Sequence, residues 1–345
     1  MTLAVVVAVA AACAAPPPGD LPPLGPSGFR VMTWNLLGAQ ADDSVYSEHA
    51  GWAARVLQWR PDVLVLQEAQ SEDVAAVTSR TGYSIAAYRW WTCDAKGNPE
   101  GVAVLVRPGL ATTGGGGTDL GTACTDPDVR RVLVWADVVP EGAAAALRVY
   151  GTHLTAGGGT ATGSRRNQIR ELRARVAADD PDGSGRWLVT GDLNVNADSV
   201  DLGLVLDGTA GETGPGALVD TFAEASPDAA GPACPSRADT PADQALLLAD
   251  PGLVARCGYT AGWAKDENPL LCDALSICLA WQVRRDTSVR NRIDYVLRAG
   301  DGPVRTVAAA VPGRGDPDWA APGAEWFRLS DHLPVVTDLV VDPAG

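Results

Sequence analysis

Lysine is almost absent from this chain, which has only Lys96 and Lys265 among its 345 residues. The formal net charge is −15, so the field of the protein repels phosphate backbones and anionic membrane surfaces at long range. These two properties argue against a strongly basic nucleic-acid-binding module. An acidic protein still binds phosphates where bound divalent cations reverse the local sign of the charge.

The chain also lacks a convincing membrane span, because the apolar run over residues 1–15 is too short to cross a bilayer comfortably. A Pro- and Gly-rich stretch follows as far as residue 28. Residues 1–28 are therefore typical of an export signal followed by a disordered tether, and we expect an exported protein, either secreted or held in the cell envelope. The step Ala11-Ala12-Cys13 resembles a bacterial lipoprotein cleavage site, although Ala10 stands where Leu is usual. Membrane attachment through a lipidated Cys13 is an open alternative.

Cysteines with the spacing of a zinc site are missing as well, since no Cys-x-x-Cys pair and no neighbouring histidine is present. Apart from Cys13, the number of cysteines is even, which in an exported chain favours disulfides over buried free thiols. Closeness in sequence favours a bond between Cys93 and Cys124. The other four cysteines then pair among themselves: Cys234, Cys257, Cys272 and Cys278.

The chain has no internal repeat, and its length suffices for one large domain, which we place at residues 29–342. The Gly-Thr segment 111–121 is interpreted as a loop, and the Pro-rich, cysteine-containing segment at about 223–286 as a surface insertion. Short apolar runs outnumber stretches with helical spacing, which predicts an α/β protein. Strands are expected at residues 30–36, 63–67, 101–107, 129–139, 147–153, 187–190, 293–297, 305–311 and 334–341, and helices at 48–59 and 165–178.

Acidic, amide or imidazole side chains follow six of these apolar runs. Strand ends in layered α/β folds are the places where functional groups converge. One such residue alone is an ordinary turn residue, but six in one chain are hard to explain as turns. The six groups are Thr33-Trp34-Asn35, Gln67-Glu68, Gly151-Thr152-His153, Gly191-Asp192-Leu193-Asn194, Ile293-Asp294-Tyr295 and Ser330-Asp331-His332.

This set and its order resemble the endonuclease/exonuclease/phosphatase superfamily, which includes DNase I-like nucleases, bacterial neutral sphingomyelinases and inositol-phosphate phosphatases. The resemblance covers the whole domain, and the motifs GDLN and SDHLPV together are its most specific part. It implies a four-layer sandwich of two packed mixed β-sheets flanked by helices, with the site at one end. The matching stretches are TWN at 33–35, LQE at 66–68, THL at 152–154, GDLN at 191–194, IDYV at 293–296 and SDHLPV at 330–335.

The resemblance also implies a metal site. Glu68 would be the central metal ligand, Asn35 would help to hold the metal or a phosphate oxygen, and Asp331 would be a further ligand of the metal or of water. Carboxylates suit Mg²⁺, with Mn²⁺ as the alternative, because both ions prefer oxygen ligands.

The catalytic roles follow from the same resemblance. Asp294 and His332 resemble the carboxylate–imidazole pair of the superfamily, and Asp192 resembles the residue that orients or deprotonates the attacking water. His153 and Asn194 are placed to hydrogen-bond phosphoryl oxygens as charge develops. The sequence does not decide whether His332 or Asp192 is the general base.

Two arginines and one histidine lie outside these motifs. Arg165 and Arg166 open a predicted helix, where they would either reach a substrate phosphate or lie on a solvated helix face. His49 matches no motif and is interpreted as structural.

The sequence therefore predicts a metal-dependent hydrolase of phosphoester bonds, a phosphodiesterase or nuclease acting outside the cytoplasm. A sphingomyelinase would need an exposed aromatic hairpin, for which Trp90-Trp91 is the candidate unless that pair packs in the core. A small-molecule phosphatase is a further alternative. A non-catalytic, envelope-attached binding module on the same fold is disfavoured because no motif is missing. The predicted partner is a phosphoester: nucleic acid, a phospholipid headgroup or a small phosphate ester. No protein partner is predicted.

Overall fold

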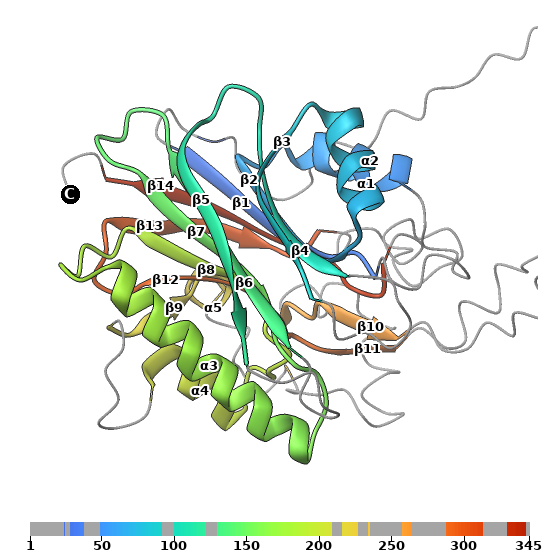
Figure 1. Ribbon diagram of the computed structural model, residues 1–345, viewed down its shortest axis with the longest axis vertical. Coiled ribbons are helices and arrows are strands. Elements are labelled where there is room, and N and C mark those ends of the chain that lie inside the picture. Colours follow the sequence, from blue (N-terminus) through green and yellow to red (C-terminus); the bar gives the residue numbers. More distant parts are fainter. Residues whose placement is uncertain are drawn as a thin grey trace, which may run out of the picture.

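The computed structural model describes residues 24, 28–37, 49–91, 100–121, 130–208, 216–226, 234, 257–263, 288–312 and 330–342. These residues form two mixed β-sheets of six strands each and a small two-stranded sheet (Figure 1). The predicted α/β class and the two-sheet sandwich are confirmed.

The first sheet places both ends of the domain side by side, because β1 pairs with β2 in parallel and with β14 in antiparallel fashion. β1 and β2 are buried along almost their whole length, as expected of apolar strands covered on both faces. The strands are, in spatial order, β13 (Val304–Ala310), β14 (Val335–Val341), β1 (Gly28–Asn35), β2 (Val63–Ala69), β4 (Gly101–Val106) and β3 (Ser84–Trp90).

The second sheet is built around the parallel pair β7 and β8. Its spatial order is β5 (Ala111–Leu120), β6 (Arg131–Val139), β7 (Leu147–His153), β8 (Trp187–Asp192), β12 (Asp294–Ala299) and β9 (Leu218–Asp220). The small sheet pairs β10 (Ala261–Trp263) with β11 (Ser288–Asn291).

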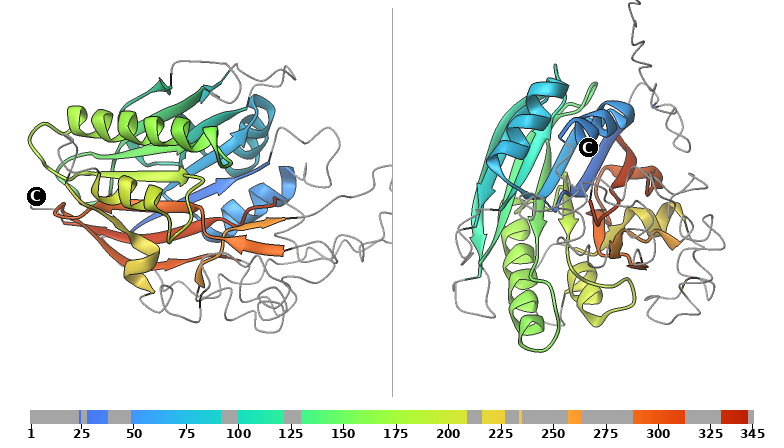
Figure 2. Two further views of the ribbon diagram at one scale, coloured as in Figure 1. Left: turned by 90° about the horizontal axis from the view of Figure 1, so that it is seen from below. Right: turned by 90° about the vertical axis from the view of Figure 1, so that its right-hand side faces the viewer.

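Helices complete the four layers (Figure 2). α1 (His49–Trp59) and α2 (Ser71–Thr81) cover the outer face of the first sheet, and α3 (Thr160–Asp179) and α4 (Val200–Asp207) cover that of the second. One buried cluster fills the space between the sheets, and a second joins the second sheet to α3 and α4. The short α5 (Thr221–Ala225) follows β9.

The interpretation of the Gly-Thr segment as a loop is wrong, since it forms β5 (Ala111–Leu120). A Cβ atom on Gly115 would lie 2.7 Å from the carbonyl oxygen of Ala86 in β3, and one on Gly116 would lie 2.7 Å from the ring of Trp135 in β6. The glycines are therefore a packing requirement of two edge strands that lie against each other. From composition alone, a run of glycines indicates a turn or loop.

Helix α3 begins five residues before the predicted start at Arg165, because its first turn consists of small polar residues without apolar periodicity. Helices α2 and α4 and strand β3 were not predicted, and β3 has a half-exposed pattern without clear alternation. Among the described residues, no helix is long and apolar enough to cross a membrane.

Cys234 and Cys257 form a disulfide, in agreement with the prediction that these belong to a set of four that pair among themselves. Cys13, Cys93 and Cys124 lie outside the described residues, as do Cys272 and Cys278. The boundaries of the domain at 29–342 and of the insertion at 223–286 stay predictions.

Candidate active site

Strand register brings three predicted residues into one row at an end of the second sheet. The parallel pairing of β7 with β8 sets His153 opposite Asp192, and the antiparallel pairing of β8 with β12 sets Asp294 opposite Asp192. All three side chains are buried. Asp192 is thus the centre of the row.

Glycine is required immediately before Asp192. Gly191 has φ of 135°, a conformation that side chains rarely adopt, and a Cβ atom there would lie 2.0 Å from the carbonyl oxygen of Thr152. Gly151 has a similar spatial role between the sheets, where a Cβ atom would lie 2.6 Å from Val65. These glycines explain why the motifs contain Gly at these positions: β7 and β8 approach each other, and the two sheets approach each other, next to the site.

Two site residues have left-handed backbone conformations, at φ of 51° for Glu68 and 52° for Asn194. The register of β2 with β4 shifts between Leu66 and Ala69, so a bulge re-aims Glu68 at the end of the strand. The backbone N–H of Asn194 donates to Asp192 Oδ1 at 2.8 Å, and its Nδ2 donates to the carbonyl oxygen of Leu154 at 2.9 Å. Such strain in non-glycine residues is typical of functional sites.

Asn35 joins the two sheets. Its Oδ1 accepts a hydrogen bond from the backbone N–H of Leu37 at 3.0 Å, which turns Nδ2 toward the site. Nδ2 donates to Glu68 Oε1 at 2.9 Å and to Asp192 Oδ2 at 3.1 Å. In this orientation Asn35 is a hydrogen-bond donor to two carboxylates.

The loop before β14 supplies the histidine of the predicted carboxylate–imidazole pair and β12 the carboxylate, with His332 Nδ1 2.8 Å from Asp294 Oδ2. The loop is fixed to β1, because Ser330 Oγ donates to the carbonyl oxygen of Asn35 at 2.6 Å. Trp34 Nε1 donates to the carbonyl oxygen of His332 at 3.0 Å. The buried Trp34 therefore packs beside the site.

The pKa values of the two site histidines are shifted in opposite directions. Burial, together with the nearby charge of Arg131, holds the pKa of His153 well below the usual histidine value. Burial alone would also lower the pKa of His332, but the carboxylates of Asp294 and Asp331 raise it well above that value. Burial raises the pKa of Asp192 to about 7, with a contribution from Asp294, and the pKa of Asp331 to about 6.

Three side chains at the strand ends offer ligand atoms close enough together for one metal ion. Among the described residues, Asp192, Asp294 and His332 each offer a ligand atom, and these atoms lie within 4.8 Å of one another. Asp294 Oδ1 and Asp331 Oδ1 are buried and have no hydrogen-bond partner in the described structure. Buried carboxylate oxygens without donors are costly unless a cation pairs with them, so this donor set fits a hard metal ion.

Arg165 and Arg166 do not join this cluster. Both pair with Asp201 of α4, at 3.1 Å for Arg165 and 2.6 Å for Arg166. Arg165 Nη1 also donates to the carbonyl oxygens of Thr155 and Gly157. These contacts hold α3, α4 and the loop after His153 together, and they lend no support to a phosphate-binding role.

Another arginine, Arg131 at the start of β6, reaches the site instead. Its Nη1 lies 3.3 Å from His153 Nδ1, and its guanidinium stacks 4.7 Å from the centre of the Trp91 ring. Trp91 is 3% exposed and contacts the ring of His153 edge-on, whereas Trp90 is 50% exposed. The aromatic pair is therefore divided between the site and the surface. Neither Arg131 nor Trp91 belongs to a recognisable motif, so the sequence did not single them out for the site.

His49 has a structural contact, as predicted. Its Nε2 lies 2.9 Å from Asp73 Oδ1, and Asp73 Oδ2 accepts from the backbone N–H of Gln70 at the start of α2. This pair joins the first turns of α1 and α2.

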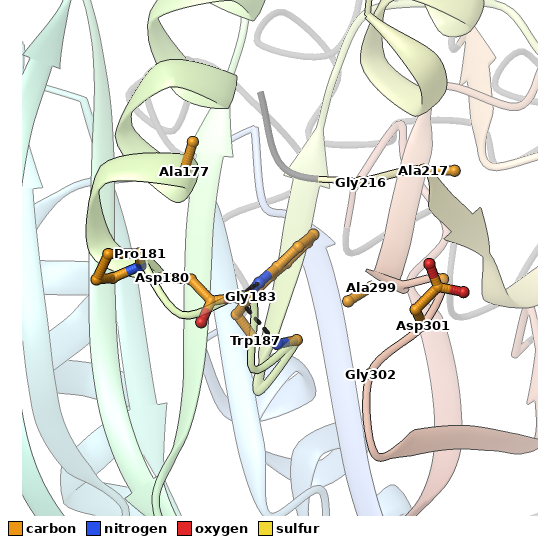
Figure 3. Close-up of a pocket in the computed structure, with 12 residues that line it drawn as sticks. Ala177, Asp180, Pro181, Gly183, Trp187, Gly216, Ala217, Ala299, Asp301 and Gly302 are labelled. Carbon is orange, nitrogen blue, oxygen red and sulfur yellow. Dashed lines mark hydrogen bonds between the residues drawn. The ribbon is translucent and has the colours of Figure 1, made fainter. Parts of the chain in front are cut away.

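A separate cavity of about 430 Å³ lies at the other end of β8, where Trp187 begins the strand that Asp192 ends (Figure 3). Trp187 Nε1 donates to Asp180 Oδ2 at 2.9 Å, and glycines of three loops form much of the wall. This cavity includes none of the predicted site residues.

Residues 32–332 match the sequence model of the Endonuclease/Exonuclease/phosphatase family. The chain belongs to this family. Membership supports phosphoester hydrolysis as the class of reaction. A search of curated proteins gives no significant match.

Solved structures of the same fold cover almost the whole chain. The catalytic domain of human Nocturnin with bound sulfate aligns with a TM-score of 0.58 and 16% identity over 92% of this chain and 94% of its own. An endonuclease/exonuclease/phosphatase from Bacteroides vulgatus aligns with a TM-score of 0.59 and 16% identity over 91% of this chain and 99% of its own. A mannosyl-6-phosphatase from Bacteroides thetaiotaomicron aligns with a TM-score of 0.54 and 15% identity over 90% of this chain and 99% of its own. At these identities the likeness shows the fold.

Proposed function

We propose that this protein is a divalent-metal-dependent phosphoester hydrolase whose active site is the cluster at the strand ends. The observation that carries the proposal is the convergence of carboxylates from both sheets on Asn35 and His332, beside buried carboxylate oxygens without donors. A purely structural cluster would pair its buried carboxylates with arginine, as Asp201 pairs with Arg165 in this chain.

Glu68 and Asp331 would hold the metal, with Mg²⁺ as the ion that carboxylates favour. Asn35, which the sequence also placed at the metal, instead turns its Nδ2 toward the site and its Oδ1 to the backbone N–H of Leu37. When bound, a divalent cation supplies positive charge that offsets the carboxylates and the phosphoryl group. Glu68 suits this role because its side chain is 18% exposed and so remains accessible from solvent. The two N–H groups of Asn35 Nδ2 orient the carboxylates of Glu68 and Asp192.

Asp192 is the proposed general base. Its Oδ2 lies 3.4 Å from His153 Nε2 and 3.9 Å from His332 Nε2, and its Oδ1 is held by the backbone N–H of Asn194. It would orient the attacking water and take the water's proton as the bond from the water oxygen to phosphorus forms. The bond from phosphorus to the ester oxygen breaks in the same displacement, and the leaving alkoxide takes a proton from solvent. Asp294 holds the Nδ1 side of His332, so that the imidazolium presents Nε2–H to the phosphoryl group.

Stabilisation of the developing charge falls to His153, Asn194 and His332. The two histidines approach Asp192 from β7 and from the loop before β14, and Asn194 lies two residues after the end of β8. A phosphoryl group next to Asp192 would thus meet donors from several elements.

The proposed substrate is a phosphodiester, including nucleic acid. The net charge of −15 leaves the bound cation as the main attraction for an anionic substrate. Burial of Trp91 against His153 removes one half of the aromatic pair that a membrane-inserting hairpin would need. A sphingomyelinase is therefore less well supported than a phosphodiesterase or nuclease.

A hydrolysis panel tests this proposal. The purified protein is assayed with bis-p-nitrophenyl phosphate, plasmid DNA, RNA, sphingomyelin and sugar or inositol phosphates, in Mg²⁺, Mn²⁺ or EDTA. We expect metal-dependent turnover of diesters, with monoesters turned over more slowly. Turnover of monoesters alone would replace the phosphodiesterase proposal with a phosphatase. A folded protein without turnover in any metal would instead support a binding module.

We also propose that the protein is exported, either secreted or attached to the envelope through Cys13. The Cys234–Cys257 disulfide supports an oxidising compartment. Fractionation of the producing cells, with mass spectrometry of the mature N-terminus and a Cys13→Ser variant, tests both parts. An unprocessed protein confined to the cytoplasm would contradict the proposal.

Metal binding should stabilise the protein more at high pH than at low pH. Because the pKa values of Asp192 and Asp331 are raised from 3.8 to about 7 and about 6, the folded metal-free protein holds protons that the unfolded chain has lost, and its stability falls as the pH rises from 3.8 to about 7. At pH 8 the cation replaces those protons, whereas at pH 5 it competes with them. We expect 10 mM Mg²⁺ to raise Tm by roughly 4–8 °C at pH 8 and by about half as much or less at pH 5. An equal Tm increase at both pH values would contradict the expectation.

A further inference from the structure

Arg131 contacts an active-site histidine from the side that faces away from the carboxylates. Its Nη1 lies 3.3 Å from His153 Nδ1, while His153 Nε2 lies 3.4 Å from Asp192 Oδ2 and 3.9 Å from Glu68 Oε1. The two ring nitrogens of His153 therefore face partners of opposite chemistry.

These partners determine where the proton of the imidazole lies. A guanidinium has only donors, so the nitrogen that faces Arg131 must accept and has no proton of its own. An ionised carboxylate accepts from a proton on the nitrogen that faces it, whereas a protonated carboxyl group also donates, so the Asp192 side is compatible with this tautomer without imposing it. A guanidinium always donates, so the contact with Arg131 decides the tautomer and leaves the proton of the ring on Nε2.

We infer that Arg131 is a positioning residue that keeps His153 as the neutral Nε2–H tautomer, so that His153 serves the reaction as a hydrogen-bond donor to the phosphoryl group. This inference rests on the proposed function for its catalytic part. A carboxylate in the place of Arg131 would accept from Nδ1–H. The unprotonated Nε2 would then face Asp192 and Glu68, lone pair against lone pair.

The surroundings fix the guanidinium in this place. It stacks 4.7 Å from the centre of the Trp91 ring, and Trp91 in turn contacts His153 edge-on with ring centres 5.6 Å apart. Burial lowers the pKa of the Arg131 guanidinium, and the charges of Glu68, Glu100 and Asp192 act in the opposite direction. Stacking on an aromatic ring suits the planar guanidinium better than a lysine ammonium. Arginine is therefore the residue type that both stacks on Trp91 and donates to Nδ1.

Nuclear magnetic resonance of ¹⁵N-histidine-labelled protein tests the inference directly, because the chain has three histidines and a His153→Gln variant assigns the signal. The ¹⁵N shifts of the ring distinguish a protonated from an unprotonated nitrogen. The compared proteins are the wild type, Arg131→Met, Arg131→Lys and Arg130→Met. Arg130 is the matched control, since it is the preceding residue and pairs with Asp119 at 3.3 Å.

We expect the wild type and Arg130→Met to show the Nε2–H tautomer, and Arg131→Met to show a mixture with Nδ1–H. The value of kcat for a phosphodiester should fall roughly 10- to 100-fold in Arg131→Met, with partial recovery in Arg131→Lys. A wild-type His153 protonated on Nδ1 overturns the inference, even if Arg131→Met fails to fold. An unchanged tautomer in Arg131→Met, or a changed tautomer at unchanged kcat, also overturns it. Failure of the proposed function would instead appear as no hydrolysis by the wild type, and the spectra would still decide the tautomer.

Discussion

Asp192→Asn is expected to lower kcat for phosphoester hydrolysis about 100- to 10,000-fold and at the same time to stabilise the metal-free protein. The loss of activity follows because an amide cannot take the proton of the attacking water. The gain in stability follows because Asp192 is buried beside Asp294, which raises its pKa to about 7, so its ionisation opposes folding at neutral pH. An asparagine removes that charge and keeps an oxygen that accepts from the N–H of Asn194, but its amide nitrogen replaces the oxygen that accepts from Asn35 Nδ2, so the expected gain is small.

The two effects are measured on the same preparation, as kcat with Mg²⁺ and as Tm in EDTA at pH 8. We expect Tm to rise by a few degrees, on the order of 1 kcal/mol. Asp201→Asn is the control: this buried carboxylate pairs with Arg165 and Arg166, so its loss should lower Tm and leave most of kcat. A variant of Asp192 that is less stable and nearly as active as the wild type would contradict the proposed role.

Gly191→Ala is expected to destabilise the protein by about 3 kcal/mol or more, the largest effect on stability that we predict for a single methyl group. The added Cβ would lie 2.0 Å from the carbonyl oxygen of Thr152. This oxygen belongs to the backbone of β7, which is paired with β8, so neither atom can move without shifting a strand. Relief would require β8 to move away from β7, which would also separate Asp192 from His153.

Urea unfolding of Gly191→Ala and of Gly163→Ala makes a matched comparison. Gly163 lies in α3 with no atom within 4 Å of an added Cβ, so alanine there should stabilise the helix by up to about 1 kcal/mol. The two substitutions are chemically identical, but Gly191→Ala should lower the free energy of unfolding and Gly163→Ala should raise it. Similar unfolding midpoints for both variants would contradict the account of Gly191.

The two-sheet fold and the family were predictable because the chemistry occurs at strand ends in a fixed order. The apolar runs before Asn35, Glu68 and Asp192 are strands in the structure, and the register of β7, β8 and β12 then follows from the fold. The assigned roles, however, come from the resemblance to a family, since spacing along the chain does not reveal which strand ends meet. These catalytic and metal-binding roles stay predictions.

The features that were missed depend on contacts between distant segments. The glycines of β5 are indistinguishable from a loop until Ala86 and Trp135 lie against them. Arg165 and Arg131 are both arginines near predicted elements, and only the positions of Asp201 and His153 separate the one that joins helices from the one that reaches the site. Likewise, the opposite pKa shifts of the two site histidines depend on which of them lies beside Arg131 and which beside Asp294.

The most direct test of the central claim is the dependence of hydrolysis on Mg²⁺ for the wild type, Glu68→Gln and His332→Ala, with His49→Ala as the control histidine outside the site. The preferred substrate of the hydrolysis panel is used, and folding is checked by circular dichroism. We predict that EDTA abolishes turnover by the wild type, that Glu68→Gln needs far more Mg²⁺ and stays slow, and that His332→Ala is inactive at any concentration. His49→Ala should retain the activity of the wild type. Full activity in EDTA, or of folded Glu68→Gln and His332→Ala, would contradict a metal-dependent active site at these strand ends.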